Sequence, residues 1–131
     1  INDTYGHQTG DLVLRHMVGL IKEQVRSCDI VARYGGEEFV VALPSTNLAA
    51  AQEIAERLRH AINTSAIILY DKQLHISVSI GMASLRELIT AHHHDNDYIC
   101  TALLDRADKA LYEAKAGGRN RVSVFTALTE Q

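Results

Sequence analysis

The chain has 131 residues, of which 47% are hydrophobic and 22% are charged, and its formal net charge is −3. This length supports one compact core and is too short for two ordinary domains, so we expect residues 1–131 to form a single domain. The mildly acidic charge excludes a general attraction to nucleic-acid polymers or membrane surfaces, and any phosphate binding must come from local basic residues.

The cysteines and the apolar runs bear on the cellular compartment of the protein. Cys28 and Cys100 lie far apart and lack metal-ligand spacing, which favours free, non-catalytic thiols in a reducing cytoplasm. No apolar run approaches the roughly 20 residues of a membrane span, and the amino terminus shows no signal-peptide pattern. We therefore expect a cytoplasmic domain, with any membrane anchor in another part of the parent protein.

The first predicted element is a helix. Residues 1–10 are polar and contain glycine, which predicts a loop that leads into it. From Leu12 to about Val25 the apolar residues recur at the spacing of one buried helical face: Leu14, Met17, Val18, Ile21 and Val25. Asp11 stands at the predicted helix start, where a carboxylate satisfies free backbone amides and meets the positive end of the helix dipole. On position alone, we expect Asp11 to cap this helix.

A β-hairpin is predicted around Gly35 and Gly36. The flanking segments 29–32 and 40–43 are rich in β-branched residues, and glycines suit a turn that needs positive φ. Glycines let a bulky anion lie against the backbone, whereas the glutamates that follow would repel that anion unless a divalent cation stood between them. This combination indicates metal and phosphate binding. Solvated glutamates on a surface hairpin are the ordinary alternative.

The middle of the chain predicts a second helix and a strand. Residues 44–47 end the hairpin and supply N-cap candidates for a helix that runs to about Asn63. The apolar stripe of this helix is Leu48, Ala51, Ile54, Ala55, Leu58 and Ile62. Residues 76–83 then alternate apolar and small side chains, which predicts a half-buried strand beside the hairpin.

Three consecutive histidines, His92–His94, fall in a polar stretch before the last helix. Neighbouring histidines point in different directions and lack the i, i+4 spacing of a helical metal site, so we expect a solvated loop rather than a metal centre. A third amphipathic helix is predicted over residues 98–116, closed by two glycines, with a last strand over residues 121–125 and a frayed tail.

The hairpin carries the strongest resemblance to a known family. The stretch Arg33-Tyr34-Gly35-Gly36-Glu37-Glu38-Phe39 resembles the signature of the GGDEF family of diguanylate cyclases, in its common variant with Glu at the third position. Further landmarks of the family recur in order along nearly the whole chain: residues 1–7 with Gly10-Asp11, Arg26-Ser27-Cys28-Asp29, Ser79-Ile80-Gly81, and Ala107–Lys115 running into Gly118–Arg121.

The element order predicts an α/β sandwich, with helices packed against a mostly antiparallel central sheet. The resemblance makes this the ferredoxin-like core that the family shares with class III nucleotidyl cyclases and polymerase palms. The resemblance also implies the reaction, in which two GTP molecules are joined into cyclic di-GMP with loss of two pyrophosphates. One domain holds one GTP, so the active species implied is a homodimer.

The implied cofactor is Mg²⁺ or Mn²⁺, held partly by Glu37, with Glu38 aiding the metal or the attacking hydroxyl. Two other functions stay open: a module of the same fold that has lost catalysis and senses GTP or cyclic di-GMP, and a cyclase for another nucleotide. The intact glycine-glutamate signature argues against the first. Asn2 and Asp11 argue against the second, because the resemblance assigns them to the guanine base and adenine lacks the N1–H donor that a carboxylate accepts.

The resemblance assigns the substrate phosphates to Gly35, Gly36, Lys115 and Arg119. Cations placed at the negative end of a helix are the ordinary explanation of Lys115 and Arg119.

A product-inhibition site is also implied, because Arg26 and Asp29 match the family's RxxD pattern. A planar arginine fork suits the phosphates or guanine edges of the cyclic product. Arg57 on the following helix is a second candidate contact. The ordinary alternatives are a surface ion pair and an exposed helical arginine.

The family pattern begins before Ile1. Its first strand ends in an Asp-x-Asp-x-Phe-Lys sequence, and the first of these aspartates is the second carboxylate ligand of the metal. We therefore expect the natural protein to extend upstream, where it supplies this strand and aspartate. We expect a molecule that truly started at Ile1 to be poorly stable or to exchange strands, with negligible cyclase activity.

Overall fold

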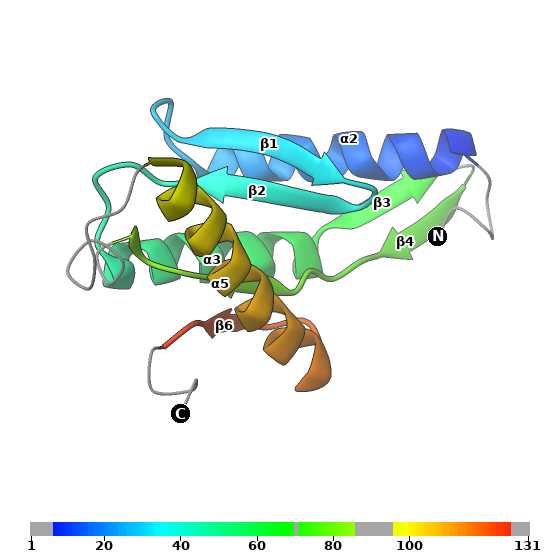
Figure 1. Cartoon of the computed structure of the whole chain (residues 1–131). Coiled ribbons are helices and arrows are strands. Elements are labelled where there is room, and N and C mark those ends of the chain that lie inside the picture. The colour runs from blue at the N-terminus through cyan, green and yellow to red at the C-terminus, as the bar shows by residue number, and fades with distance from the viewer. Residues whose placement is uncertain (1–6, 70, 86–95, 127–131) are drawn as a thin grey trace.

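The computed structural model describes residues 7–69, 71–85 and 96–126 and combines three helices with six short strands (Figure 1). In this view α2 and α3 lie behind the strands, and α5 crosses in front of them. The elements in chain order are α2 (His7–Gln24), β1 (Ile30–Gly35), β2 (Glu38–Ala42), α3 (Leu48–Thr64), β3 (Ala66–Leu69), β4 (Lys72–His75), β5 (Ile80–Met82), α5 (Asn96–Ala116) and β6 (Val122–Val124). The predicted mixture of helices and strands is confirmed. Within the described ranges no helix is both long and apolar enough to cross a membrane.

The strands form three two-stranded sheets in the described part of the chain. The predicted hairpin is present as β1 and β2, which pair antiparallel from Ile30 opposite Ala42 to Gly35 opposite Glu38, with an irregularity between Arg33 and Gly35. The other pairs are antiparallel β3–β4 and parallel β5–β6.

The strand predicted over residues 76–83 is shorter than expected and has a different partner. Only Ile80–Met82 is a strand, and it pairs with β6 rather than with the hairpin. The reason is that β6 is itself only three residues long, so it offers ladder partners to three residues and no more. Ile76 and Val78 instead place their side chains against the helical core.

Helix α2 begins earlier than its sequence predicted. It starts at His7, so the predicted loop over residues 1–10 is wrong for residues 7–10, and residues 1–6 lie outside the described part. Gly10 is buried within the helix, which costs only about 1 kcal/mol of propensity. Asp11 therefore lies one turn into α2 and is not its N-cap, which corrects the capping prediction.

Helix α3 follows its sequence signals closely. Asn47 is the N-cap, and its Oδ1 accepts a hydrogen bond of 2.8 Å from the amide of Ala50. Four predicted stripe residues are buried: Ala51, Ala55, Leu58 and Ile62. Leu58 and Ile62 join Ile21 of α2 in the core, which Val31, Phe39 and Val41 of the hairpin cover from the strand side. The two helices and the hairpin thus share one apolar interior.

Helix α5 packs closely against β5 through Gly81. A Cβ on Gly81 would overlap the backbone of Ala107 and Leu111, so only glycine permits this approach. Ala110 and Ala114 on α5 are fully buried, with 1% and 0% exposure. Small side chains on both elements therefore fix where the carboxyl end of α5 lies.

The β3–β4 hairpin was not predicted from the sequence. Each strand has four residues, and Asp71 in the connection has a positive φ of 65°. The histidine run His92–His94 and the tail after Thr126 lie outside the described residues.

Candidate nucleotide and metal site

The β1–β2 turn presents its acidic residues from a constrained backbone. Gly36 adopts a positive φ of 49°, as the turn prediction required. The Nε and Nη2 atoms of Arg33 donate hydrogen bonds of 3.0 and 2.7 Å to the carbonyl oxygen of Gly36. Arg33 on β1 therefore holds the turn through its side chain, while Glu37 lies in the turn and Glu38 begins β2.

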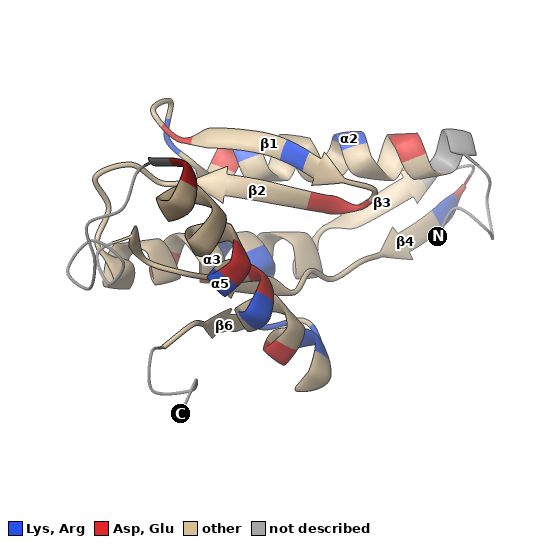
Figure 2. Ribbon diagram, viewed as in Figure 1, with Lys and Arg blue, Asp and Glu red and all other residues tan. Residues whose placement is uncertain are grey.

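The turn is open to a ligand. Glu37 and Glu38 are exposed, and neither carboxylate has a hydrogen-bond or ion-pair partner in the described part of the chain; the acidic end of the hairpin is visible in Figure 2. A Cβ added to Gly35 or Gly36 would meet no atom within 4 Å. Space is therefore available where the sequence predicted that an anion approaches the backbone.

These residues fit the implied metal. Mg²⁺ takes oxygen ligands and is usually held by one or two protein carboxylates together with substrate phosphates and water. Glu37 and Glu38 offer carboxylates of that kind, and within the described residues no group of three or more His, Cys, Asp and Glu side chains could enclose an ion alone. The turn suits a cation shared with a bound nucleotide rather than a closed protein site.

Of the residues predicted to contact guanine, the structure describes only one. Asp11 is exposed on the first turns of α2, and Asn2 lies outside the described residues. The amino-terminal end of α2 and the β1–β2 turn lie toward the same side of the molecule, at the right in Figure 1. Contact of one nucleotide with both Asp11 and the acidic turn stays a prediction.

The two cationic residues predicted to bind the substrate phosphates lie at the carboxyl end of α5. Lys115 is in the last turn of the helix and Arg119 follows it, and both side chains are exposed and unpaired within the described ranges. The chain between them leaves the helix through residues of positive φ: 124° at Gly118 and 64° at Arg119. The amide of Arg119 still donates to Ala114 at 3.0 Å. Two free cations are thus presented beside a helix end.

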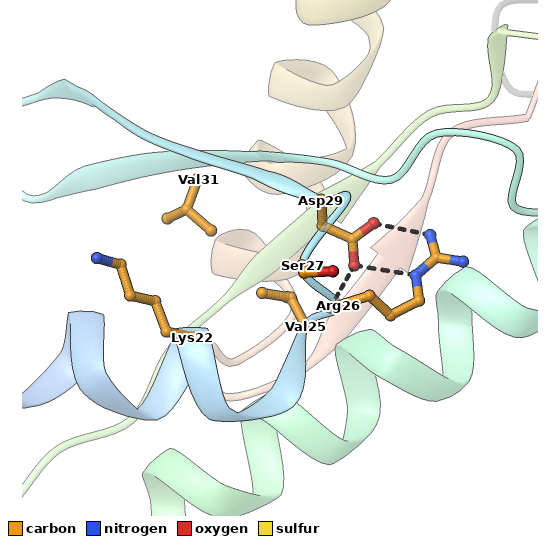
Figure 3. Close-up of a pocket in the computed structure, with 6 residues that line it drawn as sticks. All are labelled: Lys22, Val25, Arg26, Ser27, Asp29 and Val31. Carbon is orange, nitrogen blue, oxygen red and sulfur yellow. Dashed lines mark hydrogen bonds and ion pairs between the residues drawn. The ribbon is translucent and has the colours of Figure 1, made fainter.

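Arg26 and Asp29 form a tight turn between α2 and β1. Asp29 accepts hydrogen bonds from the Arg26 amide at 2.7 Å, from Arg26 Nε at 3.1 Å and from Arg26 Nη2 at 2.7 Å. These bonds hold the pKa of the Asp29 carboxyl below its usual value and raise the pKa of Arg26. Both residues line an open pocket of about 430 Å³ with Lys22, Val25, Ser27 and Val31 (Figure 3).

Arg26 is also tied to the segment after the hairpin. Its Nη2 donates to the carbonyl oxygen of Pro44 at 3.1 Å and to the hydroxyl of Thr46. The guanidinium therefore faces away from Lys22, whose side chain extends in the opposite direction (Figure 3). Arg57 is not among the residues that line this pocket, and its Nη2 donates to the carbonyl oxygen of Gln24 at 3.1 Å.

Two residues that shape these sites, Arg33 and Thr46, have no role that the sequence alone predicts. In the sequence Arg33 is recognisable only as part of the signature, and Thr46 only as an N-cap candidate. Arg33 could have been found from its place three residues before the glycine carbonyl that it binds. No local signal connects Thr46 with Arg26, which is 20 residues away.

The chain is similar to known proteins over nearly its whole length. The family model described as "Diguanylate cyclase, GGDEF domain" matches residues 1–121. Diguanylate cyclase A of Treponema denticola is 43% identical over 125 residues, which covers 95% of this chain and 31% of that protein. The chain thus spans about a third of the length of this curated relative.

Two solved structures share the fold. The GGDEF domain of DgcB from Caulobacter crescentus, in complex with c-di-GMP, superimposes with a TM-score of 0.79 at 32% identity, covering 94% of this chain and 68% of that one. The active GGEEF domain of a diguanylate cyclase from Vibrio cholerae superimposes with a TM-score of 0.79 at 32% identity, covering 96% of this chain and 74% of that one.

Proposed function

We propose, since the chain belongs to the GGDEF domain family of diguanylate cyclases, that it joins two GTP molecules into cyclic di-GMP. The observation that carries the proposal is the β1–β2 turn, where Glu37 and Glu38 are exposed and unpaired within the described residues beside open space at Gly35 and Gly36. The complete Gly-Gly-Glu-Glu-Phe sequence favours a working enzyme over a sensor that only binds nucleotide.

The proposed chemistry is two phosphoryl transfers. The ribose 3′-hydroxyl of each GTP attacks the α-phosphorus of the other, so that one P–O bond forms at each centre. The bond from that phosphorus to the bridging oxygen breaks, and pyrophosphate leaves with it. Each hydroxyl loses its proton as it attacks, and Glu38 is near enough in sequence to the turn to assist this loss.

Residues of this chain bind and orient the nucleotide. Asp11, with Asn2, accepts and donates at the guanine edge, and Lys115 and Arg119 neutralise the triphosphate. Glu37 would hold Mg²⁺ or Mn²⁺, which supplies positive charge for the developing pyrophosphate and lowers the pKa of the attacking hydroxyl. Gly35 and Gly36 leave room for the phosphates to lie against the backbone.

The reaction as proposed requires a homodimer. One site presents one set of acidic and basic residues, and each GTP must meet the hydroxyl of another, so two domains face one another during catalysis. We place this domain in the cytoplasm, with any membrane attachment through other parts of the parent protein.

We also propose that Arg26 and Asp29 bind the cyclic product and inhibit the enzyme. The pocket beside them has room for part of a nucleotide, and the arginine fork suits phosphate or guanine. Arg57 contributes if it leaves Gln24, which is its partner in this structure.

Product analysis tests the proposed function. Purified protein is incubated with GTP and Mg²⁺, and the nucleotides are separated and identified. We expect cyclic di-GMP and pyrophosphate in a ratio of about one to two, as the balanced reaction demands. GTP binding without turnover would support the sensor instead, and product from ATP would overturn the guanine assignment of Asp11.

A further inference from the structure

The segment that carries Arg119 has an unusual backbone. Gly118, Arg119 and Asn120 have consecutive positive φ values of 124°, 64° and 49°. Glycine adopts such values freely and asparagine tolerates them, but an arginine rarely does so unless the surrounding structure imposes it. Something beside the helix end must therefore hold this conformation.

The side chain of Asn120 links this segment to α3. Its Oδ1 accepts a hydrogen bond of 3.0 Å from Arg59 Nη1, and its Nδ2 donates one of 3.2 Å to Asn63 Oδ1. Arg59 and Asn63 are four residues apart on α3, so they present adjacent groups on one helix face. Both ends of the Asn120 amide are thus bound by a single rigid element.

Two further contacts complete the support. The backbone amide of Asn120 donates a hydrogen bond of 3.2 Å to the hydroxyl of Ser79, which immediately precedes β5. Arg59 is itself fixed by Glu56, whose Oε1 lies 2.9 Å from Nε and whose Oε2 lies 3.1 Å from Nη2. These hydrogen bonds lower the pKa of Glu56 and raise that of Arg59, so both groups stay charged. Asn120 is therefore held from α3 and from β5 at once.

We propose that Asn120 is a positioning residue, which with Arg59 and Asn63 holds Arg119 in the conformation that points its guanidinium at the substrate triphosphate. In this role Asn120 itself contacts no reacting atom. The inference rests on the proposed function, because Arg119 must first be a triphosphate ligand. The affinity for the triphosphate would then depend on α3. From the sequence, this helix has only a structural role and one candidate contact of the inhibitory site.

A double-mutant cycle between Asn120 and Arg119 tests the proposal. The probe is 3′-deoxy-GTP, which lacks the attacking hydroxyl, so its dissociation constant can be measured by calorimetry without turnover. We expect Asn120→Ala to weaken binding about tenfold, roughly the loss of one hydrogen bond to a charged group. In an Arg119→Ala background the same change should alter binding by less than about twofold, because the group that Asn120 positions is gone.

Two variants separate hydrogen bonding from backbone strain. Asn120→Gly permits positive φ without the side chain and should bind as weakly as Asn120→Ala. Arg59→Met removes one partner and leaves Asn120 in place, so it should also weaken binding and keeps the test valid if Asn120→Ala does not fold. The matched control is Asn47→Ala, which removes the α3 N-cap and lowers the melting temperature while leaving the dissociation constant unchanged.

The outcomes are distinct. If Asn120→Ala weakens binding equally with and without Arg119, or if Asn120→Gly binds as well as the unmodified protein, the positioning role is wrong. If Arg119→Ala weakens binding but Asn120→Ala and Arg59→Met do not, the positioning role fails and the triphosphate role of Arg119 stands. If Arg119→Ala has no effect, the triphosphate assignment fails and the positioning role fails with it.

Discussion

The acidic β1–β2 turn and the basic segment around Arg119 are held in place in opposite ways. The β1–β2 turn depends on its own neighbourhood, since Arg33 binds the carbonyl oxygen of Gly36 only three residues away. The segment around Arg119 depends on distant residues, since the partners of Asn120 are 61, 57 and 41 residues away. The turn should therefore tolerate changes in the rest of the fold, whereas the basic segment should follow any movement of α3, β5 or α5.

The largest expected effect comes from removing the carboxylate that would hold the metal while the structure of the turn stays intact. Glu37→Ala should lower cyclic di-GMP formation by at least about 1000-fold, since phosphoryl transfer depends on the cation that this carboxylate would hold. Stability should change by less than about 0.5 kcal/mol, because the residue is exposed. Product assays and denaturant titration measure the two effects.

Glu53→Ala is the matched control for this change. Glu53 is an exposed glutamate on α3 without a partner in the described residues, so its removal should change neither activity nor stability. Turnover of Glu37→Ala within a few fold of the unmodified protein would refute the metal assignment.

The next largest effect comes from moving α5, the helix that carries the basic residues at its carboxyl end. Gly81→Ala places a methyl group against the backbone of Ala107 and Leu111, so α5 must shift. We expect a loss of about 3 kcal/mol of unfolding free energy, at the upper end for overpacking, together with weaker GTP binding. Urea denaturation gives the first value and calorimetry the second.

Gly19→Ala provides the comparison within one protein. Gly19 is helical and a Cβ there meets nothing within 4 Å, so alanine should stabilise the protein by about 0.5–1 kcal/mol. If Gly81→Ala were as stable as Gly19→Ala, the close packing of α5 on β5 would not exist in solution.

A smaller change tests how local the turn's support is. Arg33→Lys keeps the charge but cannot donate two fixed hydrogen bonds to Gly36, so Glu37 should be less well placed. We expect turnover to fall about tenfold with a nearly unchanged melting temperature, as for the loss of one exposed hydrogen bond. Arg15→Lys on α2 is the control. A large drop in melting temperature would mean that the turn supports the whole fold.

The smallest effect concerns the Arg26–Asp29 pocket, which combines both kinds of support. The Asp29 partner is local, whereas Thr46 is 20 residues from Arg26. Thr46→Val should free the arginine fork for the cyclic product and lower the product concentration for half-inhibition by about threefold, within the range of one neutral hydrogen bond. Arg26→Ala should abolish that inhibition. Unchanged inhibition in both variants would show that the product binds elsewhere.

The sequence predicted what short-range signals control. Apolar spacing placed Leu58 and Ile62 in the core, and Asn47 marked the start of α3. Glycines before acidic residues identified the turn. The start of α2 was predicted wrongly, because Asp11 has the character of an N-cap and Gly10 that of a loop residue. The helix nevertheless continues back through Gly10 to His7, since nothing there forbids helix.

Long-range partners could not be predicted in the same way. Short strands such as β3 and β4 carry little pattern, and the pairing of β5 with β6 depends on where α5 returns the chain. Arg59 has no predicted role, yet it reaches Asn120 because α3 and the segment that follows α5 meet in space. The residues of the acidic turn were therefore visible in the sequence, whereas the supports of the basic segment were visible only in the structure.

The proposal that the acidic turn holds the metal and Arg119 binds the triphosphate is tested most directly by the effect of Mg²⁺ on nucleotide affinity. Binding of 3′-deoxy-GTP is titrated with and without Mg²⁺ in the unmodified protein, Glu37→Ala and Arg119→Ala. We expect Mg²⁺ to tighten binding to the unmodified protein and to Arg119→Ala, which binds more weakly throughout, but not to Glu37→Ala. A Glu37→Ala protein that gains as much affinity from Mg²⁺ as the unmodified protein would contradict the claim that the acidic turn holds the metal.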